Sequence, residues 1–132
     1  LTLMEKEKMV AEGAGALSVA ACLFDKIPLK DRKVVCVVSG GNIDFNILSK
    51  VVTKALITTG RLSNLVVDAV DKPGELSRIS SIISKEGANI IEIYREQGDS
   101  DTPINNCRLR ITLETKDFEH LERIKNTLNN PD

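Results

Sequence analysis

A strictly alternating pattern over residues 107–114 is the feature that most restricts how this chain can fold. Its apolar residues are Cys107, Leu109, Ile111 and Leu113, and between them stand Arg108, Arg110, Thr112 and Glu114. Neighbouring side chains of a β-strand point to opposite faces of the sheet, so the pattern predicts a strand with one buried and one wetted face. One-sided burial of this kind is typical of an antiparallel sheet.

The segments on either side of this strand follow a familiar order. We predict strands over 61–71 and 88–98, helices over 72–87 and 116–130, and a polar loop over 99–106. Pro73 favours the first turn of the first helix, and Gly87 ends it. The residues expected to face inward are Leu76, Ile79, Ile82 and Ile83 in that helix, and Phe118, Leu121, Ile124 and Leu128 in the second. The order β-α-β-β-α is five sixths of a ferredoxin-like βαββαβ unit of the α+β class, and its last strand is expected beyond Asp132.

The first 60 residues have a different pattern. Residues 13–26 are rich in Ala and predict a helix buried on more than one side, and residues 44–58 predict a second helix that Gly60 ends. Between these helices every position of the run Val34–Val38 is apolar, which is typical of a strand covered on both faces. One such strand cannot close a core alone. We therefore predict that residues 1–60 are a helix-strand-helix remnant of a larger α/β domain.

Composition argues against several kinds of partner. The net charge is −1 and no run of Lys or Arg occurs, so nucleic acid is not an expected partner. Arg108 and Arg110 alternate on one strand, but an RNA-binding sheet also needs exposed aromatic side chains, and only Tyr94 is available.

No apolar run approaches the ~20 residues that span a bilayer, and the N-terminus lacks the pattern of a signal peptide, so a cytoplasmic location is expected. The cysteines are isolated and His120 is assigned to a solvated helix face, so no metal site is expected.

Residues 61–132 resemble an ACT domain, the small-molecule-sensing module of many amino-acid enzymes. The resemblance rests on the stretch DKPGELSRISSIISKEGANI at 71–90, with its Asp-x-Pro-Gly-x-Leu turn between strand and helix. It implies a homo-oligomer joined through these domains, with an effector at their interface. The implied effector residues are Asp71, Lys72, Pro73, Gly74, Glu75 and Leu76, facing Ala88, Asn89 and Ile90.

The effector implied by this resemblance is an amino acid such as isoleucine or valine, or a nucleotide. Gly74 would expose backbone N–H groups at a helix N-terminus to a carboxylate, and Asn89 offers both a donor and an acceptor. The alternative is that residues 71–74 are only a turn made of favourable turn residues, in a domain that assembles dimers without binding a ligand.

Residues 1–60 are similar to the C-terminal end of the catalytic domain of pyridoxal-phosphate threonine dehydratases. The matching stretches are AEGAGALSVAAC and VVSGGNIDFNILSKVV. The resemblance implies that Ser39 hydrogen-bonds the pyridine nitrogen of the cofactor and that Gly40 and Gly41 let the backbone pass close to its ring. Glu12 matches a position near the cofactor, and its alternative role is a helix N-terminal carboxylate favoured by the helix dipole.

The same resemblance implies an enzyme that deaminates threonine to 2-oxobutanoate and ammonia. That reaction needs a Schiff-base lysine in a Ser-x-Lys-x-Arg motif and a glycine-rich phosphate loop, and neither motif occurs in the sequence. We therefore expect no catalytic residue and no bound pyridoxal phosphate in this chain, which would be the C-terminal fragment of such an enzyme. The alternative is a stand-alone ACT-type regulatory protein without catalysis. In either case the unpaired sheet edge and the apolar helix faces predict self-association.

Overall fold

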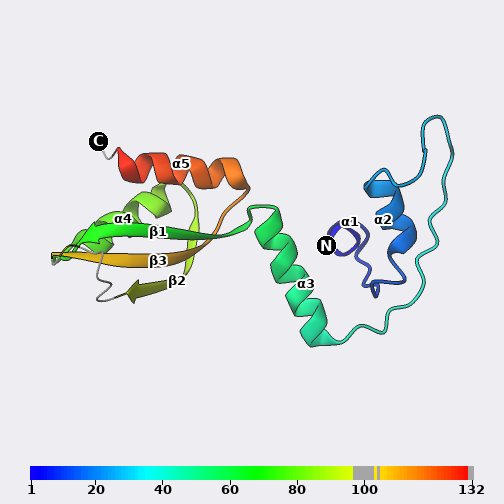
Figure 1. Cartoon of the computed structure of the whole chain (residues 1–132), viewed down its shortest axis with the longest axis horizontal. Coiled ribbons are helices and arrows are strands. Elements are labelled where there is room, and N and C mark those ends of the chain that lie inside the picture. The colour runs from blue at the N-terminus through cyan, green and yellow to red at the C-terminus, as the bar shows by residue number, and fades with distance from the viewer. Residues whose placement is uncertain (97–102, 104, 131–132) are drawn as a thin grey trace. The chain divides into compact units, whose positions relative to one another are not determined.

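The computed structural model describes residues 1–96, 103 and 105–130, and the chain divides into two compact units (Figure 1). The first unit comprises residues 1–52 and the second residues 53–132, so the division falls within α3 (Phe45–Thr58). The domain boundary after residue 60 stays a prediction from the sequence.

The second unit is built on a three-stranded antiparallel sheet in the order β1-β3-β2. Its elements are β1 (Leu62–Val70), α4 (Glu75–Lys85), β2 (Asn89–Glu96), β3 (Asn106–Glu114) and α5 (Phe118–Asn129). This order confirms the predicted α+β, ferredoxin-like arrangement. Within the described residues, no strand pairs with the outer edge of β1 or of β2. Part of the predicted loop over 99–106, and the end of the second predicted strand, lie outside those residues.

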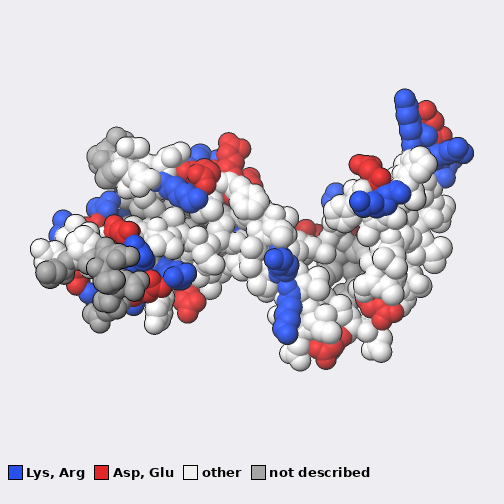
Figure 2. Space-filling view, viewed as in Figure 1, with Lys and Arg blue, Asp and Glu red and all other residues white. Residues whose placement is uncertain are grey.

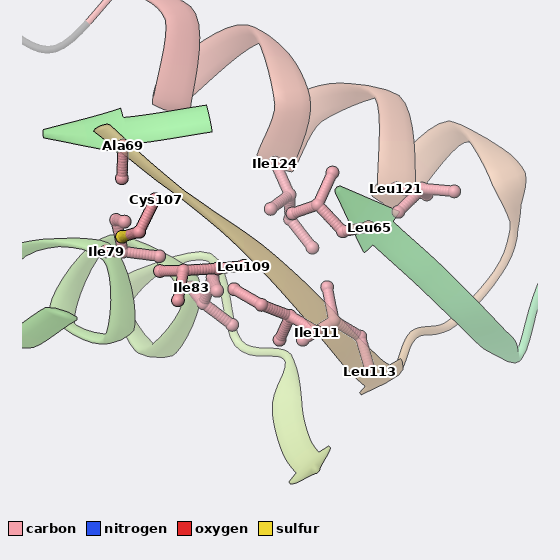
Figure 3. Packing of buried hydrophobic residues seen from close by; sticks show 10 residues of the cluster. All are labelled: Leu65, Ala69, Ile79, Ile83, Cys107, Leu109, Ile111, Leu113, Leu121 and Ile124. Atoms are coloured by element: carbon pink, nitrogen blue, oxygen red, sulfur yellow. The ribbon is translucent and has the colours of Figure 1, made fainter. Parts of the chain in front are cut away.

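The core of this unit lies between the sheet and its two helices, and Figure 3 shows side chains of β1 and β3 pointing toward α4 and α5. The buried apolar residues are Leu65, Ala69, Ile79, Ile83, Cys107, Leu109, Ile111, Leu113, Leu121 and Ile124. The alternation in β3 is therefore confirmed. Two residues predicted to face inward do not, because Leu76 and Phe118 stand in the first turns of their helices and remain 48% and 55% exposed.

His120 takes an inward position that the sequence analysis gave to solvent, and its assignment to a solvated helix face was wrong. Its side chain is 1% exposed. The backbone N–H of Lys116 donates to His120 Nδ1 at 3.1 Å, and Nε2 lies 2.9 Å from the carbonyl oxygen of Glu86. Because Nδ1 is an acceptor here, the proton lies on Nε2, which donates to Glu86. The imidazole thus joins the start of α5 to the end of α4.

The register of β2 shifts by one residue near its start. Ile90 pairs with Leu113 and Glu92 with Thr112, so Ile91 is an extra residue that bulges from the ladder. Because of this bulge, Ile93 and Arg95 lie on the helix-covered face, opposite Ile111 and Leu109 of β3.

A tight turn joins α3 to β1 at Gly60. Its φ is +69°, and a Cβ built there would lie 2.5 Å from the backbone nitrogen of Phe118. The carbonyl oxygen of Gly60 accepts a hydrogen bond of 2.5 Å from the buried Thr115 hydroxyl. The predicted helix over 44–58 is confirmed as α3, and Gly60 follows it as expected.

The first unit contains α1 (Thr2–Glu7) and α2 (Leu17–Leu23). The predicted helix over 13–26 is therefore shorter than expected. The prediction of a strand over Val34–Val38 was wrong, because this segment forms no ladder in the described structure and Val35 is 91% exposed. A strand needs a neighbour for its backbone hydrogen bonds, and the described part of this unit supplies none.

Candidate functional site

A cavity of about 300 Å³ lies at the β1–α4 turn, on the side of the sheet that faces the helices. It is lined by Ala69, Val70, Asp71, Lys72, Glu75, Leu76, Ile93, Arg95, Cys107 and Leu109. The apolar part of this lining comes mainly from the ends of β1 and β2 and from the start of β3. The charged part comes from the turn and from Arg95. The cavity thus combines an apolar floor with charges of both signs.

Arg95 and Asp71 form an ion pair within this lining, with the Arg95 Nη2 atom donating to the Asp71 carboxylate. Their side chains are 44% and 46% exposed. Solvent therefore screens the pair, and such exposed pairs contribute little to stability. A ligand carrying charges of its own can replace either partner at low cost.

Glu75 is held differently. Arg78 donates to Glu75 Oε1 from Nε at 2.9 Å and from Nη2 at 2.5 Å, and Lys72 Nζ lies 3.9 Å from Oε2. The hydrogen bonds from Arg78 hold the pKa of the Glu75 carboxyl below its ordinary value. Glu75 is therefore ionised at neutral pH and adds a fixed negative charge to one wall of the cavity.

The predicted effector residues fall into three groups. Asp71, Glu75 and Leu76 line the cavity, together with Lys72. Pro73 and Gly74 are exposed and lie outside its lining.

Gly74 has a φ of +90° and precedes the first residue of α4, in the αL conformation that glycine adopts most readily. Its role in binding stays a prediction.

Asn89 and Ile90 form the third group and lie elsewhere in the same chain. Glu114 pairs with both Asn89 and Leu62, so Asn89 lies level with the start of β1, whereas Asp71 follows the end of that strand. These two residues line a separate groove of about 580 Å³ along α4. A single copy of the chain therefore does not bring Asn89 and Ile90 to the Asp71–Leu76 turn.

Sequence reasoning missed Arg95, one of the two cations in the cavity lining. Alternation counted from Ile90 would place Arg95 on the opposite face of the sheet. The bulge at Ile91 reverses that parity. A bulge of this kind has no reliable signal in one sequence, and the apolar pair Ile90–Ile91 was the only hint.

The residues predicted to meet a pyridoxal cofactor lie close together in the first unit. The Glu12 N–H donates to the carbonyl oxygen of Gly40 at 3.1 Å, and a Cβ built on Gly40 would lie 2.3 Å from Glu12 Oε1. The Ser39 N–H donates to the carbonyl oxygen of Gly15 at 3.3 Å. Gly41 continues the turn, with the Val10 carbonyl oxygen 3.5 Å from its built Cβ.

These residues fit only one side of the cofactor. Ser39 is exposed and can offer a hydroxyl to a ring nitrogen. Gly40 has a φ of +80°, which glycine adopts most readily, and the Glu12 side chain leaves no room for a Cβ there. The group also needs a lysine for its aldehyde and a cradle for its phosphate, and the sequence holds neither motif. The present residues therefore do not make a complete site, and we derive no chemical step through the cofactor.

On the open face of the sheet, several of the described charged side chains are paired with one another. Arg108 pairs with Asp68 at 2.7 Å and Arg110 with Glu96 at 2.6 Å. Figure 2 shows Lys and Arg interspersed with Asp and Glu. Among the described residues, no three His, Cys, Asp or Glu side chains are placed to hold a metal ion. None of the helices in this part of the chain combines the length and the hydropathy that crossing a membrane requires.

Comparison with known proteins identifies relatives of both units. A family model described as an ACT domain matches residues 59–131. An L-threonine ammonia-lyase of Thermotoga maritima is 38% identical over 128 residues, which are 97% of this chain and 32% of that protein. The corresponding protein of Geobacter sulfurreducens is 39% identical over 124 residues, 94% of this chain and 31% of its own.

A more distant match is the biosynthetic L-threonine dehydratase IlvA of Lactococcus lactis, 37% identical over 83 residues, 63% of this chain and 20% of its own. The chain thus spans about a third of the length of the first two relatives. No solved structure matched the chain.

Proposed function

Because this chain belongs to the ACT domain family, we propose that its second unit is a regulatory module that binds a small amino acid in the cavity at the β1–α4 turn. The observation that carries the proposal is the Arg95–Asp71 ion pair beside an apolar floor. The family match covers this unit, and it supports amino-acid sensing as the general role.

The charges of the cavity match the backbone of a zwitterionic amino acid. The guanidinium of Arg95 can receive the α-carboxylate of a ligand in a two-point hydrogen bond. Asp71, freed from Arg95 by that exchange, can accept from the α-ammonium group. The ligand therefore replaces an exposed ion pair with two others and leaves no charge unpartnered, which keeps the cost of binding low.

Size and charge favour an amino acid over a nucleotide. At about 300 Å³ the cavity is at the lower end of the range for small-molecule sites. Its two carboxylates, Asp71 and Glu75, would repel the phosphates of a nucleotide, and Lys72 and Arg95 only balance them. The floor formed by Ile93, Cys107 and Leu109 suits a branched aliphatic side chain such as that of isoleucine or valine.

Self-association would bring the remaining predicted residues to this cavity. The outer edge of β2 is unpaired within the described residues, and two copies can join there by antiparallel pairing about a twofold axis. Because β2 runs from residue 89 to residue 96, pairing about its middle sets Asn89 of a second copy opposite Glu96. Ile90 of that copy then pairs with Arg95 and shares its face of the sheet, at the mouth of the cavity, and Asn89 stands next to it on the open face.

The first unit supports a wider proposal about the whole protein. The two threonine ammonia-lyases match nearly all of this chain, across both units. We propose that the chain is the C-terminal part of a cytoplasmic, pyridoxal-phosphate-dependent threonine ammonia-lyase, and that effector binding at the second unit regulates it. Within that enzyme, Ser39 would orient the cofactor ring by its nitrogen, and Gly40 and Gly41 would let the backbone approach the ring. The alternative is a regulatory protein without catalysis.

Calorimetry on the 132-residue chain tests the effector proposal. We expect isoleucine or valine to bind and ATP not to bind. Arg95→Gln should weaken binding by at least ~10-fold, because a charge-assisted pair to the ligand is lost. Arg110→Gln is the matched control, since it removes a similar ion pair from the open face of the sheet. The proposal would be contradicted if Arg95→Gln and the unaltered chain bound the amino acid with equal affinity. It would also be contradicted if no amino acid bound to a folded dimer.

Sedimentation tests the pairing of β2. Ile91 is 52% exposed on β2 and Val66 is 50% exposed on β1, so Ile91→Lys and Val66→Lys place the same charge on opposite edge strands. Ile91→Lys should raise the dimer dissociation constant, and Val66→Lys should not. If only Val66→Lys separates the copies, the pairing runs through β1 and Ile90 of the second copy does not reach the cavity.

A further inference from the structure

Two of the three cysteines lie within contact distance of each other in the first unit. The Cys22 and Cys36 Sγ atoms are 3.4 Å apart, although 14 positions separate them in the sequence. Cys22 is the second-last residue of α2, and Cys36 belongs to the extended segment before the Ser39 turn. Both side chains are partly exposed, so a small reagent can reach them, whereas Cys107 is buried in the core of the second unit.

Two hydrogen bonds next to the pair hold it in place. The Ser18 hydroxyl donates to the Val37 carbonyl oxygen at 2.8 Å, and the Ser39 N–H donates to the Gly15 carbonyl oxygen at 3.3 Å. The segment from Cys36 to Ser39 therefore lies beside α2 and the residues that precede it, and these contacts bring the two sulfurs together. A disulfide has an S–S length of about 2.0 Å, so bond formation requires the sulfurs to approach by about 1.4 Å. Rotation of two side chains can supply a movement of that size.

We infer that Cys22 and Cys36 are a redox-active pair that a low-molecular-weight disulfide converts into a reversible intrachain disulfide. One cysteine loses its proton and attacks the reagent, whose S–S bond breaks and releases one thiolate. The second cysteine then attacks the resulting mixed disulfide. The second cysteine gives up its proton as the Cys22–Cys36 bond forms and a second thiolate leaves, and each of the two released thiolates takes up one proton. The two protein thiols lose two electrons, and one reagent disulfide becomes two thiols.

The bond would fasten the Ser39 turn to α2. Cys36 precedes Ser39 by three residues, and Gly40 lies against Glu12, so the covalent link holds the residues assigned to the cofactor ring. The exposed segment between the two cysteines becomes a closed loop. In the reduced pair the hydrogen bond between the two sulfurs raises the pKa of the Cys22 thiol. The pair therefore persists as thiols until an oxidant arrives.

Trypsin separates the two cysteines unless a disulfide joins them, because Lys26, Lys30, Arg32 and Lys33 stand between them. The test is to incubate the 132-residue chain with oxidised glutathione, alkylate the remaining thiols under denaturing conditions and map the tryptic peptides. We expect the number of alkylated cysteines to fall from three to one. The peptides of residues 9–26 and 34–50 should be joined, and dithiothreitol should restore all three thiols.

Single variants separate this pair from other thiol chemistry. Cys107→Ser should still form the link, and its alkylated thiols should fall from two to none. Cys22→Ser and Cys36→Ser should each stop at a mixed disulfide with glutathione. Three results would overturn the inference. The first is a disulfide that includes Cys107, and the second is a disulfide between two chains whose yield rises with protein concentration. The third is an unaltered chain that stops at glutathione adducts. The unaltered chain alone decides the question if a serine variant fails to fold.

Discussion

Replacing Gly60 by alanine tests how tightly the α3–β1 turn packs against the start of α5. A methyl group there would lie 2.5 Å from the backbone nitrogen of Phe118 and 2.8 Å from its Cγ atom. Backbone atoms cannot move aside as the end of a flexible side chain can. The methyl group therefore has to displace the first turn of α5, which also carries the buried His120.

The cost has two parts. A non-glycine residue at φ +69° costs about 1–2 kcal/mol, which the lower entropy of the unfolded alanine chain offsets by about 0.4–1 kcal/mol. Steric overlap in a packed site adds about 1–3 kcal/mol. We expect Gly60→Ala to lower the free energy of unfolding of the second unit by about 2–4 kcal/mol. For a unit of this size the melting temperature then falls by roughly 10–25 °C.

Gly87→Ala is the matched control, because Gly87 has a φ of +82° but nothing within 4 Å of its built Cβ. It should cost about 1 kcal/mol or less, through backbone strain alone. Tyr94 is the only tyrosine and the chain has no tryptophan, so urea unfolding followed by tyrosine fluorescence reports the second unit selectively. Equal unfolding midpoints for Gly60→Ala and Gly87→Ala would refute the steric argument.

Three further predictions use the same urea assay. His120→Ala should cost about 2–4 kcal/mol, because it opens a cavity and leaves buried backbone groups without partners; a cost under about 0.5 kcal/mol would show that water replaces the ring. Ile111→Ala, at a fully buried position of the central strand, should cost about 3–5 kcal/mol, and Val66→Ala, half exposed on β1, should cost less than about 1 kcal/mol. Hydrogen bonds from Arg78 and Arg108 lower the pKa of Glu75 and of Asp68, respectively, in the folded chain. Both ionised carboxylates therefore stabilise the fold at pH values above their ordinary pKa near 4, and this stabilisation is lost as the pH falls through the lowered pKa values. Unfolding midpoints that rise between about pH 5 and pH 3 would contradict that sign.

The sequence predicted the second unit well where a pattern repeats. The alternation around Ile111 requires a strand with one buried face whatever its neighbours are, and the structure has that strand at the centre of the sheet. His120 could not be assigned correctly in the same way. Its burial depends on the carbonyl oxygen of Glu86, which is 34 positions away and invisible to any local pattern.

The first unit shows the opposite limit. The run Val34–Val38 has the composition of a buried strand, but composition supplies no hydrogen-bonding neighbour, and Val35 and Val37 are exposed in the structure. At the candidate site, the turn that holds Asp71, Glu75 and Leu76 could be found from its motif. Arg95 could not, because its position depends on the bulge at Ile91.

That bulge has a consequence for how the cavity can change over time. If β2 lost the bulge and Ile91 paired with Thr112, every later residue of the strand would change faces, so Tyr94 would enter the cavity and Arg95 would leave it. A register shift of one residue therefore exchanges a cation for a phenol without any substitution in the lining itself. Variation of ligand preference among related chains should be sought in the presence of this bulge as well as in the identity of the lining residues.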